Sequence, residues 1–215
     1  MIYGLDPSLN GFGWAKLNGS GLFANSGRIH TSPKNQFVHR HWHIKTELGS
    51  IIEPNSVVGI ESVAFEGTQS EGLYALYTHT MEVLWQKGCD VVLFDPTTLK
   101  CLSKEKWAVD PEIKPFITMD KPEMIQVATQ LSNNNFKSSD EADAYLAGYF
   151  ADRFWQLYDG RISVGDLGPS EQKSFAGIKQ PTKGKNAGQI LKTGAIFREN
   201  VRFFRFSRHD LSFEE

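Results

Sequence analysis

Four acidic residues of this chain have the side-chain type and the sequence setting of a cation site. Asp6 follows the apolar segment MIYGL, and Glu61 stands inside the nearly continuous apolar segment SVVGIESVAF. Asp140 and Asp143 open the segment DEADAYLAGYFA, where a spacing of three places both on one face of a helix. An ionised side chain inside an apolar strand is costly unless a cation pairs with it, so Glu61 is the most informative of the four.

Carboxylates without His or Cys companions suit Mg²⁺, or Mn²⁺ in its place, rather than zinc. Two such ions can activate a water molecule and stabilise the leaving oxygen during phosphodiester hydrolysis. The same residues also have interpretations without a function. Asp140 and Asp143 fit the opening turn of a helix, where acids cap the helix or offset its dipole, and Glu61 could lie at an exposed position on one sheet face or at a strand end.

A layered α/β domain would bring the four acids together. The opening residues predict an antiparallel meander of three strands, because three apolar segments follow one another with the turn signal Asn18-Gly19 before the third. Later strands are expected in 56–65, 89–96 and 195–206, helices in 36–53, 71–87, 122–131 and 140–157, and loops in the polar segments 97–122 and 168–189. If the first and fourth strands are neighbours and the last helix packs on both, the acids line one pocket.

Composition indicates a globular chain. With 215 residues and 40% hydrophobic content, it can fill the core of one catalytic-size domain with an appendage. Cys89 and Cys101 are too few for a disulfide framework or a zinc cluster, so both are expected to be free thiols. No segment reaches the roughly 18 continuous apolar residues of a membrane span, and no basic region with an apolar run opens the sequence. We therefore expect a cytoplasmic protein without a membrane partner.

The net charge of −2 hides a basic C-terminal region. Residues 171–209 contain nine Lys or Arg and two Glu, with Phe197, Phe203, Phe204 and Phe206 interleaved among the later basic residues. Basic residues interleaved with aromatic ones are typical of surfaces that combine phosphate contacts with base stacking. A solvated basic strand whose phenylalanines pack on the core is the alternative, and the sequence does not separate the two.

The segment GLDPSLNGFGWA resembles the opening motif of the RuvC-type Holliday junction resolvases, members of the RNase H-like superfamily. That family carries a Glu on its fourth strand, as at Glu61, and a D-x-x-D pair on its last core helix, as at Asp140 and Asp143. The resemblance runs over about residues 1–155. It implies an RNase H-like α/β fold, with a mixed sheet of a three-stranded antiparallel meander plus parallel strands, flanked by helices.

The resemblance also implies an activity. The chain would be an endonuclease that resolves four-way DNA junctions as a homodimer, with two Mg²⁺ ions held by the four acids. Lys100 in FDPTTLK and Lys121 in MDKPEMI match lysines expected to contact the phosphate or to stabilise the transition state. Phe65 matches, with an offset of one residue, an aromatic that wedges into the junction, whereas Ser8 stands where the family often has Gly.

We divide the chain into a nuclease domain, 1–157, and a basic, Phe-rich C-terminal extension, 158–215, with a flexible Gly/Lys/Pro segment. The helix expected at 71–87 is our first choice for the dimer interface. The compact size and the unmatched extension favour a phage-encoded member of the family, which would act in the cytoplasm of a bacterial cell or of an infected host.

Other hypotheses stay open. The same metal chemistry would serve a nuclease for other branched DNA or for RNA–DNA hybrids. An actin-like ATPase also opens with a strand, an Asp and a Gly-containing hairpin, but no second phosphate motif is present; a DNA-binding module without nuclease activity would not need all four acids. Lys104 and Lys106, in an expected loop facing the site, and Arg40 are candidate DNA contacts, with solvated surface charges as the alternative.

Overall fold

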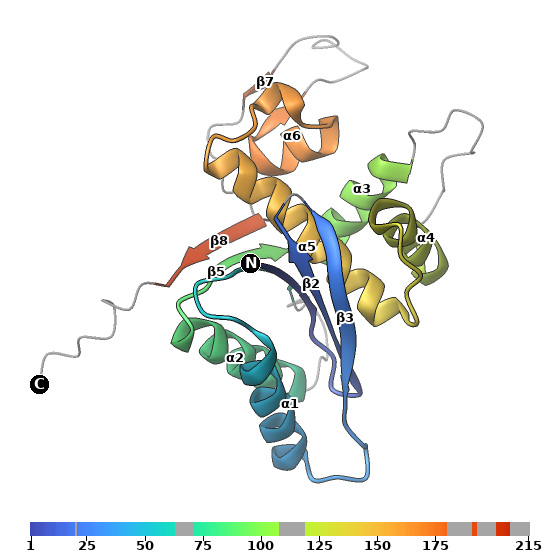
Figure 1. Ribbon diagram of the computed structural model, residues 1–215, viewed down its shortest axis with the longest axis vertical. Helices are drawn as coiled ribbons and strands as arrows, with labels where there is room; N and C mark the ends of the chain where they lie inside the picture. The colour runs from blue at the N-terminus through green and yellow to red at the C-terminus, as the bar shows by residue number, and fades with distance from the viewer. Residues whose placement is uncertain (20, 63–70, 108–118, 180–190, 193–200, 207–215) are drawn as a thin grey trace, which may run out of the picture.

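The computed structural model describes residues 1–19, 21–62, 71–107, 119–179, 191–192 and 201–206. At their centre lies a six-stranded sheet in the order β3-β2-β1-β4-β5-β8 (Figure 1). Its strands are β1 (Ile2–Asp6), β2 (Gly11–Asn18), β3 (Leu22–His30), β4 (Val57–Glu61), β5 (Asp90–Phe94) and β8 (Val201–Arg205). The short strands β6 (Ile178–Lys179) and β7 (Leu191–Lys192) pair with each other.

The sheet is mixed. β1, β2 and β3 form an antiparallel meander, β1, β4 and β5 are parallel, and β8 runs antiparallel to β5. The helices are α1 (Phe37–Ile51), α2 (Glu71–Gln86), α3 (Pro96–Trp107), α4 (Lys121–Ser132), α5 (Ser139–Tyr158) and α6 (Pro169–Phe175), with a 3₁₀ turn, η1 (Val164–Asp166). Among the described helices, none has both the length and the apolar composition needed to cross a membrane. The predicted mixed sheet, a three-stranded antiparallel meander plus parallel strands flanked by helices, is confirmed.

Two hydrophobic layers enclose the sheet. α1 and α2 cover one face, and α5 lies across the other, with α3 and α4 beside it (Figure 1). Side chains alternate between the faces along each strand, so Tyr3 and Leu5 of β1 pack toward α1 and α2, whereas Ile2 packs toward α5. The same alternation decides on which face the acids at the strand ends lie.

Three glycines on neighbouring strands allow the backbone of α5 to approach the sheet closely. Gly4 of β1 and Gly59 of β4 are partners in the parallel register, and Gly13 of β2 is the partner of Asp6. A Cβ atom added to any of the three would overlap a backbone carbonyl of α5. The helix that carries two of the acids therefore rests on a glycine floor, formed by Gly4, Gly13 and Gly59.

Two segments expected to be loops form helices instead. α3 occupies the first part of 97–122, and α6 occupies part of 168–189. Each begins with a proline, Pro96 or Pro169. Proline suits the first position of a helix, because the N–H that it lacks would have no partner there. Leu99 and Leu102 then bury one face of α3 in the core.

The described part of the C-terminal extension packs with the rest of the chain. β8 adds to the central sheet at β5, and the Phe203 ring lies 5.9 Å from that of Trp155 and 5.0 Å from that of Tyr158. Arg205 forms an ion pair with Asp90 at 2.8 Å. A basic strand with packed aromatic side chains is the interpretation that fits Phe203 and Phe206, whereas Phe204 is 38% exposed; 193–200 and 207–215 lie outside the described residues.

Replacing Gly59 by Ala tests the glycine floor. The added Cβ would overlap the carbonyl oxygen of Ala147 and push α5 away from the sheet, so we expect the free energy of unfolding to fall by about 1–3 kcal/mol. Gly49→Ala is the matched control, because a Cβ there meets nothing within 4 Å and Ala favours a helix by up to about 1 kcal/mol. Urea unfolding followed by circular dichroism measures the free energy of unfolding of both variants. Equal losses of stability in the two would contradict the close approach of α5 to the sheet.

Candidate active site

Asp6 and Glu61 end neighbouring parallel strands on the face that α5 covers. The register pairs Leu5 of β1 with Ile60 of β4, and each acid stands one residue beyond that pair. Leu5 and Ile60 are buried toward α1 and α2, which turns the next residue on each strand toward α5. Both acids are partly buried, so Glu61 is not exposed on a sheet face, although it does lie at a strand end, the other part of that alternative. The prediction that the first and fourth strands are neighbours is confirmed.

Ser138 caps the helix that carries the other two acids. Its side-chain oxygen accepts a hydrogen bond from the Glu141 N–H at 3.2 Å, and the Glu141 carboxylate accepts one from the Ser26 hydroxyl at 2.7 Å. Capping by Asp140 or Asp143 is therefore wrong, because Ser138 fills that position. The first turns of α5 still favour negative charge through the helix dipole, and its partial positive charge adds to the environment of the acids.

A cavity of about 320 Å³ lies where the strand ends meet the start of α5. Its lining consists of Asp6, Ser8, Glu61, Lys100, Asp120, Lys121, Met124, Asp140 and Asp143. The structure thus brings together all four predicted acids and both predicted lysines, one from α3 and one from α4. Residues far apart in the sequence form one acidic cavity bordered by two cations.

Three carboxylates of the cavity, Asp6, Glu61 and Asp143, hold protons more tightly than isolated ones. Burial raises the pKa of Asp6 well above its ordinary value, and the other three acids add to the rise. Burial also raises the pKa of Glu61 to about 7, with Asp143 adding to the rise and Lys100 opposing it. Burial raises the pKa of Asp143 to about 6 against the opposing charges of Lys121 and Lys100. Burial is thus the main cause of all three rises, and the nearby lysines offset only part of it.

Arg28 of β3 brings a third cation to the edge of the cavity. Arg28 and Asp6 are both cross-strand partners of Gly13, so the three residues share one face of the sheet. The guanidinium extends over Gly11, where a Cβ would overlap it, and its Nη2 binds Asp140 Oδ2 at 2.7 Å. Arg28 therefore fixes the orientation of the Asp140 carboxylate.

The donor chemistry suits an oxygen-ligated cation. Asp143 Oδ1 is buried and has no hydrogen-bond partner, as expected of a carboxylate oxygen placed to bind a cation. Within the described part of the chain, no three His, Cys, Asp or Glu side chains stand close enough to share a metal ion. The residues fit Mg²⁺ in chemistry, and side-chain rotation would be needed to close them around it.

Lys104 and Lys106 lie in the last turn of α3, so the expectation that they stand in a loop facing the site is wrong. Neither lysine lines the cavity. Lys106 forms an ion pair with the buried Glu171 at 2.9 Å, which directs its side chain toward α6 instead. A DNA contact by Lys104 stays a prediction.

Arg40 has a structural task that the sequence did not indicate. Its guanidinium donates hydrogen bonds to the Leu9 carbonyl at 3.0 Å and to the Asn10 side chain at 2.7 Å. These bonds tie α1 to the turn that follows Asp6. A DNA contact by Arg40 stays a prediction, and Phe65 lies outside the described residues.

Sequence analysis missed Arg28 and Asp120 as residues of the site. Asp120 precedes α4, and its N–H donates to the Glu123 side chain at 3.1 Å. The spacing of an acid three residues before Glu123 is a helix-start signal that could have identified it. Arg28 had no comparable local signal, because its side of the sheet depends on the register of β2 with β3.

Two solved structures of RuvC from Thermus thermophilus are similar to this chain, one of them in complex with a Holliday junction substrate. Their TM-scores are 0.54 and 0.56, and in each 16% of the residues are identical over 74% of this chain and 97% of the RuvC chain. The fold is that of RuvC. The RuvC-type fold expected from the sequence is thereby confirmed, although no family model and no curated protein matches the sequence.

The pKa values of the cavity predict a pH-dependent stability without metal. Glu61 and Asp143 have folded pKa values of about 7 and 6, above their ordinary values of 4.5 and 3.8. At pH values between the ordinary and the folded pKa of each group, the folded chain binds more protons than the unfolded one. The free energy of unfolding therefore falls as the pH rises through this range. We expect the free energy of unfolding in EDTA to drop by roughly 1–3 kcal/mol from about pH 5 to about pH 8.

Urea unfolding at several pH values measures this slope. Glu61→Gln should flatten it, because the replacement cannot ionise, whereas Glu47→Gln on the exposed face of α1 should leave it unchanged. Excess Mg²⁺ should restore stability at the higher pH. A slope that is the same for all three proteins would contradict the clustering of the carboxylates.

Proposed function

We propose that this chain is a metal-dependent endonuclease that resolves four-way DNA junctions. The observation that carries the proposal is the cavity in which four carboxylates from β1, β4 and α5 meet a lysine from α3 and a lysine from α4. The RuvC fold supports it, since one of the similar structures is a complex with a Holliday junction substrate.

In this proposal the four predicted acids, the two lysines and Arg28 each have a task. The four acids of the cavity would hold two Mg²⁺ ions, for which Mn²⁺ can substitute. Bound there, the ions would lower the pKa of the attacking water and neutralise the leaving oxygen. Lys100 and Lys121 would contact the phosphate and offset the negative charge that develops in the transition state. Arg28 keeps the Asp140 carboxylate oriented.

Cleavage of end-labelled DNA tests the activity. In Mg²⁺, we expect paired symmetric nicks in a four-way junction and none in linear duplex. Glu61→Gln and Asp140→Asn should reduce the rate by about 100-fold or more, since even the partners of metal ligands are worth 10- to 100-fold. Glu47→Gln, which removes an exposed carboxylate of α1, should cut at the wild-type rate.

Assays with flaps, forks, RNA–DNA hybrids and ATP distinguish the remaining hypotheses. Cleavage of flaps, forks or RNA–DNA hybrids in place of the junction would keep the metal site and replace the substrate. Tight junction binding without cleavage of any DNA would favour a binding module. Hydrolysis of ATP without cleavage of DNA would favour the actin-like ATPase.

We also propose that the active form is a homodimer, because symmetric cleavage of a four-way junction needs two active sites that face opposite strands. An apolar surface suited to a second copy lies on α1, where Phe37, Val38 and Trp42 are 43%, 72% and 69% exposed. Together with Ala75 and His79 of α2, these residues line a groove of about 350 Å³. Exposed apolar groups of this size lose contact with water when two copies meet.

Trp42→Glu tests this interface. Burying a negative charge in an apolar interface is costly, so we expect sedimentation to change from a dimer to a monomer, with paired nicking reduced to single nicks. Ser50→Glu adds the same charge at the exposed far end of α1 and should leave the dimer intact. A wild-type chain that sediments as a monomer while bound to the junction would overturn the proposal.

A further inference from the structure

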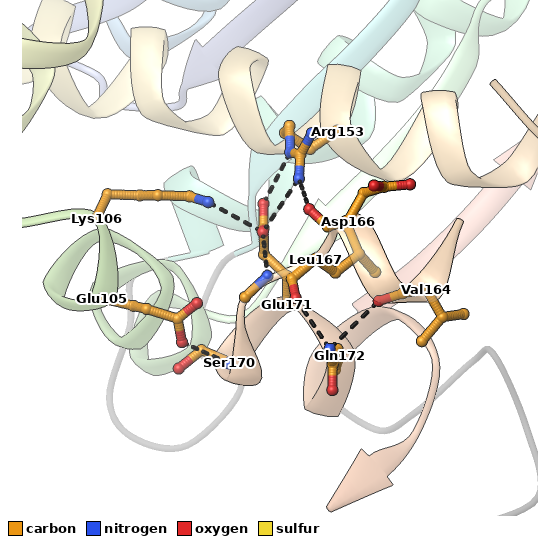
Figure 2. Close-up of polar contacts among 10 residues, drawn as sticks. Glu105, Lys106, Arg153, Val164, Asp166, Leu167, Ser170, Glu171 and Gln172 are labelled. Atoms are coloured by element: carbon orange, nitrogen blue, oxygen red, sulfur yellow. Dashed lines mark hydrogen bonds and ion pairs between the residues drawn. The ribbon is translucent and has the colours of Figure 1, made fainter. Parts of the chain in front are cut away.

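Glu171 is a buried carboxylate beyond residue 157, where the expected nuclease domain ends. It lies in α6 and is 1% exposed. Its Oε1 accepts a hydrogen bond from Arg153 Nε at 3.1 Å, and its Oε2 accepts from Lys106 Nζ and the Gly168 N–H, both at 2.9 Å (Figure 2). We call the group of Glu171, Lys106 and Arg153 the Glu171 clamp. It joins three helices, because Lys106 belongs to α3 and Arg153 to α5.

Further hydrogen bonds hold the same junction of helices. Arg153 Nη2 donates to the Asp166 carbonyl at 2.8 Å, and the Ser170 N–H donates to the Glu105 carboxylate of α3 (Figure 2). Burial raises the pKa of Glu171, but the hydrogen bonds from Arg153, Gly168 and Lys106 outweigh burial and lower it overall. The carboxylate is therefore charged and fully partnered at neutral pH. Charge-assisted hydrogen bonds of this kind are directional, so they fix the angle between the helices as well as the contact.

Two of the three helices that the clamp joins, α3 and α5, also carry residues of the acidic cavity. Lys100 stands six residues before Lys106 on α3, a separation of about 9 Å along a rigid helix. Asp143 stands ten residues before Arg153 on α5, a separation of about 15 Å. Holding the later part of α3 on α5 therefore sets where Lys100 lies relative to the acids. Lys100 is close enough to lower the pKa of both Glu61 and Asp143.

We propose that Glu171 is a positioning residue of the candidate active site: by clamping α3 onto α5, it places Lys100 against the carboxylates. The effect on cleavage rests on the proposed nuclease function, whereas the effect on the position of α3 does not. A buried ion pair adds little net stability compared with apolar packing, so stability alone does not account for a charged group at this place. The C-terminal extension thereby contributes to catalysis from outside the cavity.

A double-mutant cycle tests whether Glu171 acts through Lys100. Glu171→Gln should lower the single-turnover rate of junction cleavage by about 10- to 100-fold, the effect of displacing a group by about 1 Å, with junction affinity changed less than about threefold. Lys100→Met should be slow as well. The double variant should be no slower than Lys100→Met alone, since Lys100 is the group that the clamp positions. If the two substitutions instead lowered the cleavage rate independently, so that their fold-reductions multiplied in the double variant, the inference would be overturned.

Controls separate positioning from a general loss of structure. Arg205→Gln removes an ion pair of the same extension whose partner, Asp90, belongs to β5, and it should cut at the wild-type rate. If Glu171→Gln does not fold, Lys106→Met replaces it, because Glu171 then keeps Arg153 as a partner. Lys106→Met should cleave as slowly as expected for Glu171→Gln. Combined with Lys100→Met, it should be no slower than Lys100→Met alone. A wild-type rate for Lys106→Met would overturn the inference.

A label on α3 gives a readout that needs no cleavage. Cys101 is exposed beside Lys100, whereas Cys89 is buried, so a nitroxide reagent should modify Cys101 alone. We expect Glu171→Gln to increase the mobility of this label in the electron spin resonance spectrum, and Arg205→Gln to leave it unchanged. An unchanged spectrum in Glu171→Gln would overturn the inference. If no protein cuts any DNA, the nuclease proposal fails, and the label alone decides whether the clamp positions α3.

Discussion

The close approach of α5 to the sheet is the interaction on which the candidate site depends. The glycine floor removes side chains from three neighbouring strands, and the helix backbone occupies the space where Cβ atoms would lie. The start of α5 then reaches the ends of β1 and β4, where the other two acids stand. The three glycines thus determine how far the acids of α5 lie from the acids of the strands. A side chain at any of the three glycines would push α5 away from the sheet. Asp140 and Asp143 would move with the helix, whereas Asp6 and Glu61 would stay on their strands.

The charge of the cavity is the second constraint, because gathering four carboxylates there lowers the stability of the fold. Four carboxylates share a small, partly buried cavity, so burial and mutual repulsion raise the pKa of Asp6, Glu61 and Asp143. Two lysines, Arg28 and the start of α5 offset part of this charge. The remaining negative charge is what a divalent cation would neutralise. Sites that must bind such a cation are commonly less stable without it, because their ligands cannot be paired within the chain.

The extension after residue 157 illustrates how tertiary packing can override local composition. Its polar, proline-containing start predicted a loop, yet Pro169 opens α6, and Phe175 of that helix packs on Phe154 of α5 at 5.6 Å between ring centroids. Its last described strand, β8, closes the edge of the sheet beside β5. Both elements are short and would be marginal in isolation, so they form because the core offers surfaces to bury them.

The sequence by itself determined the acids and most elements around them. An acid inside an apolar strand needs a partner wherever the strand lies, and the period of apolar residues is a local property, so Glu61 and its strand were predictable. Only the tertiary structure decided that Arg28 joins the site. Counting back from the turn at Asn18-Gly19 would pair Gly13 with Gly27, but a bulge in the pairing of β2 with β3 makes Arg28 the partner. A shift of one residue turns every later side chain to the opposite face, and packing sets such a bulge.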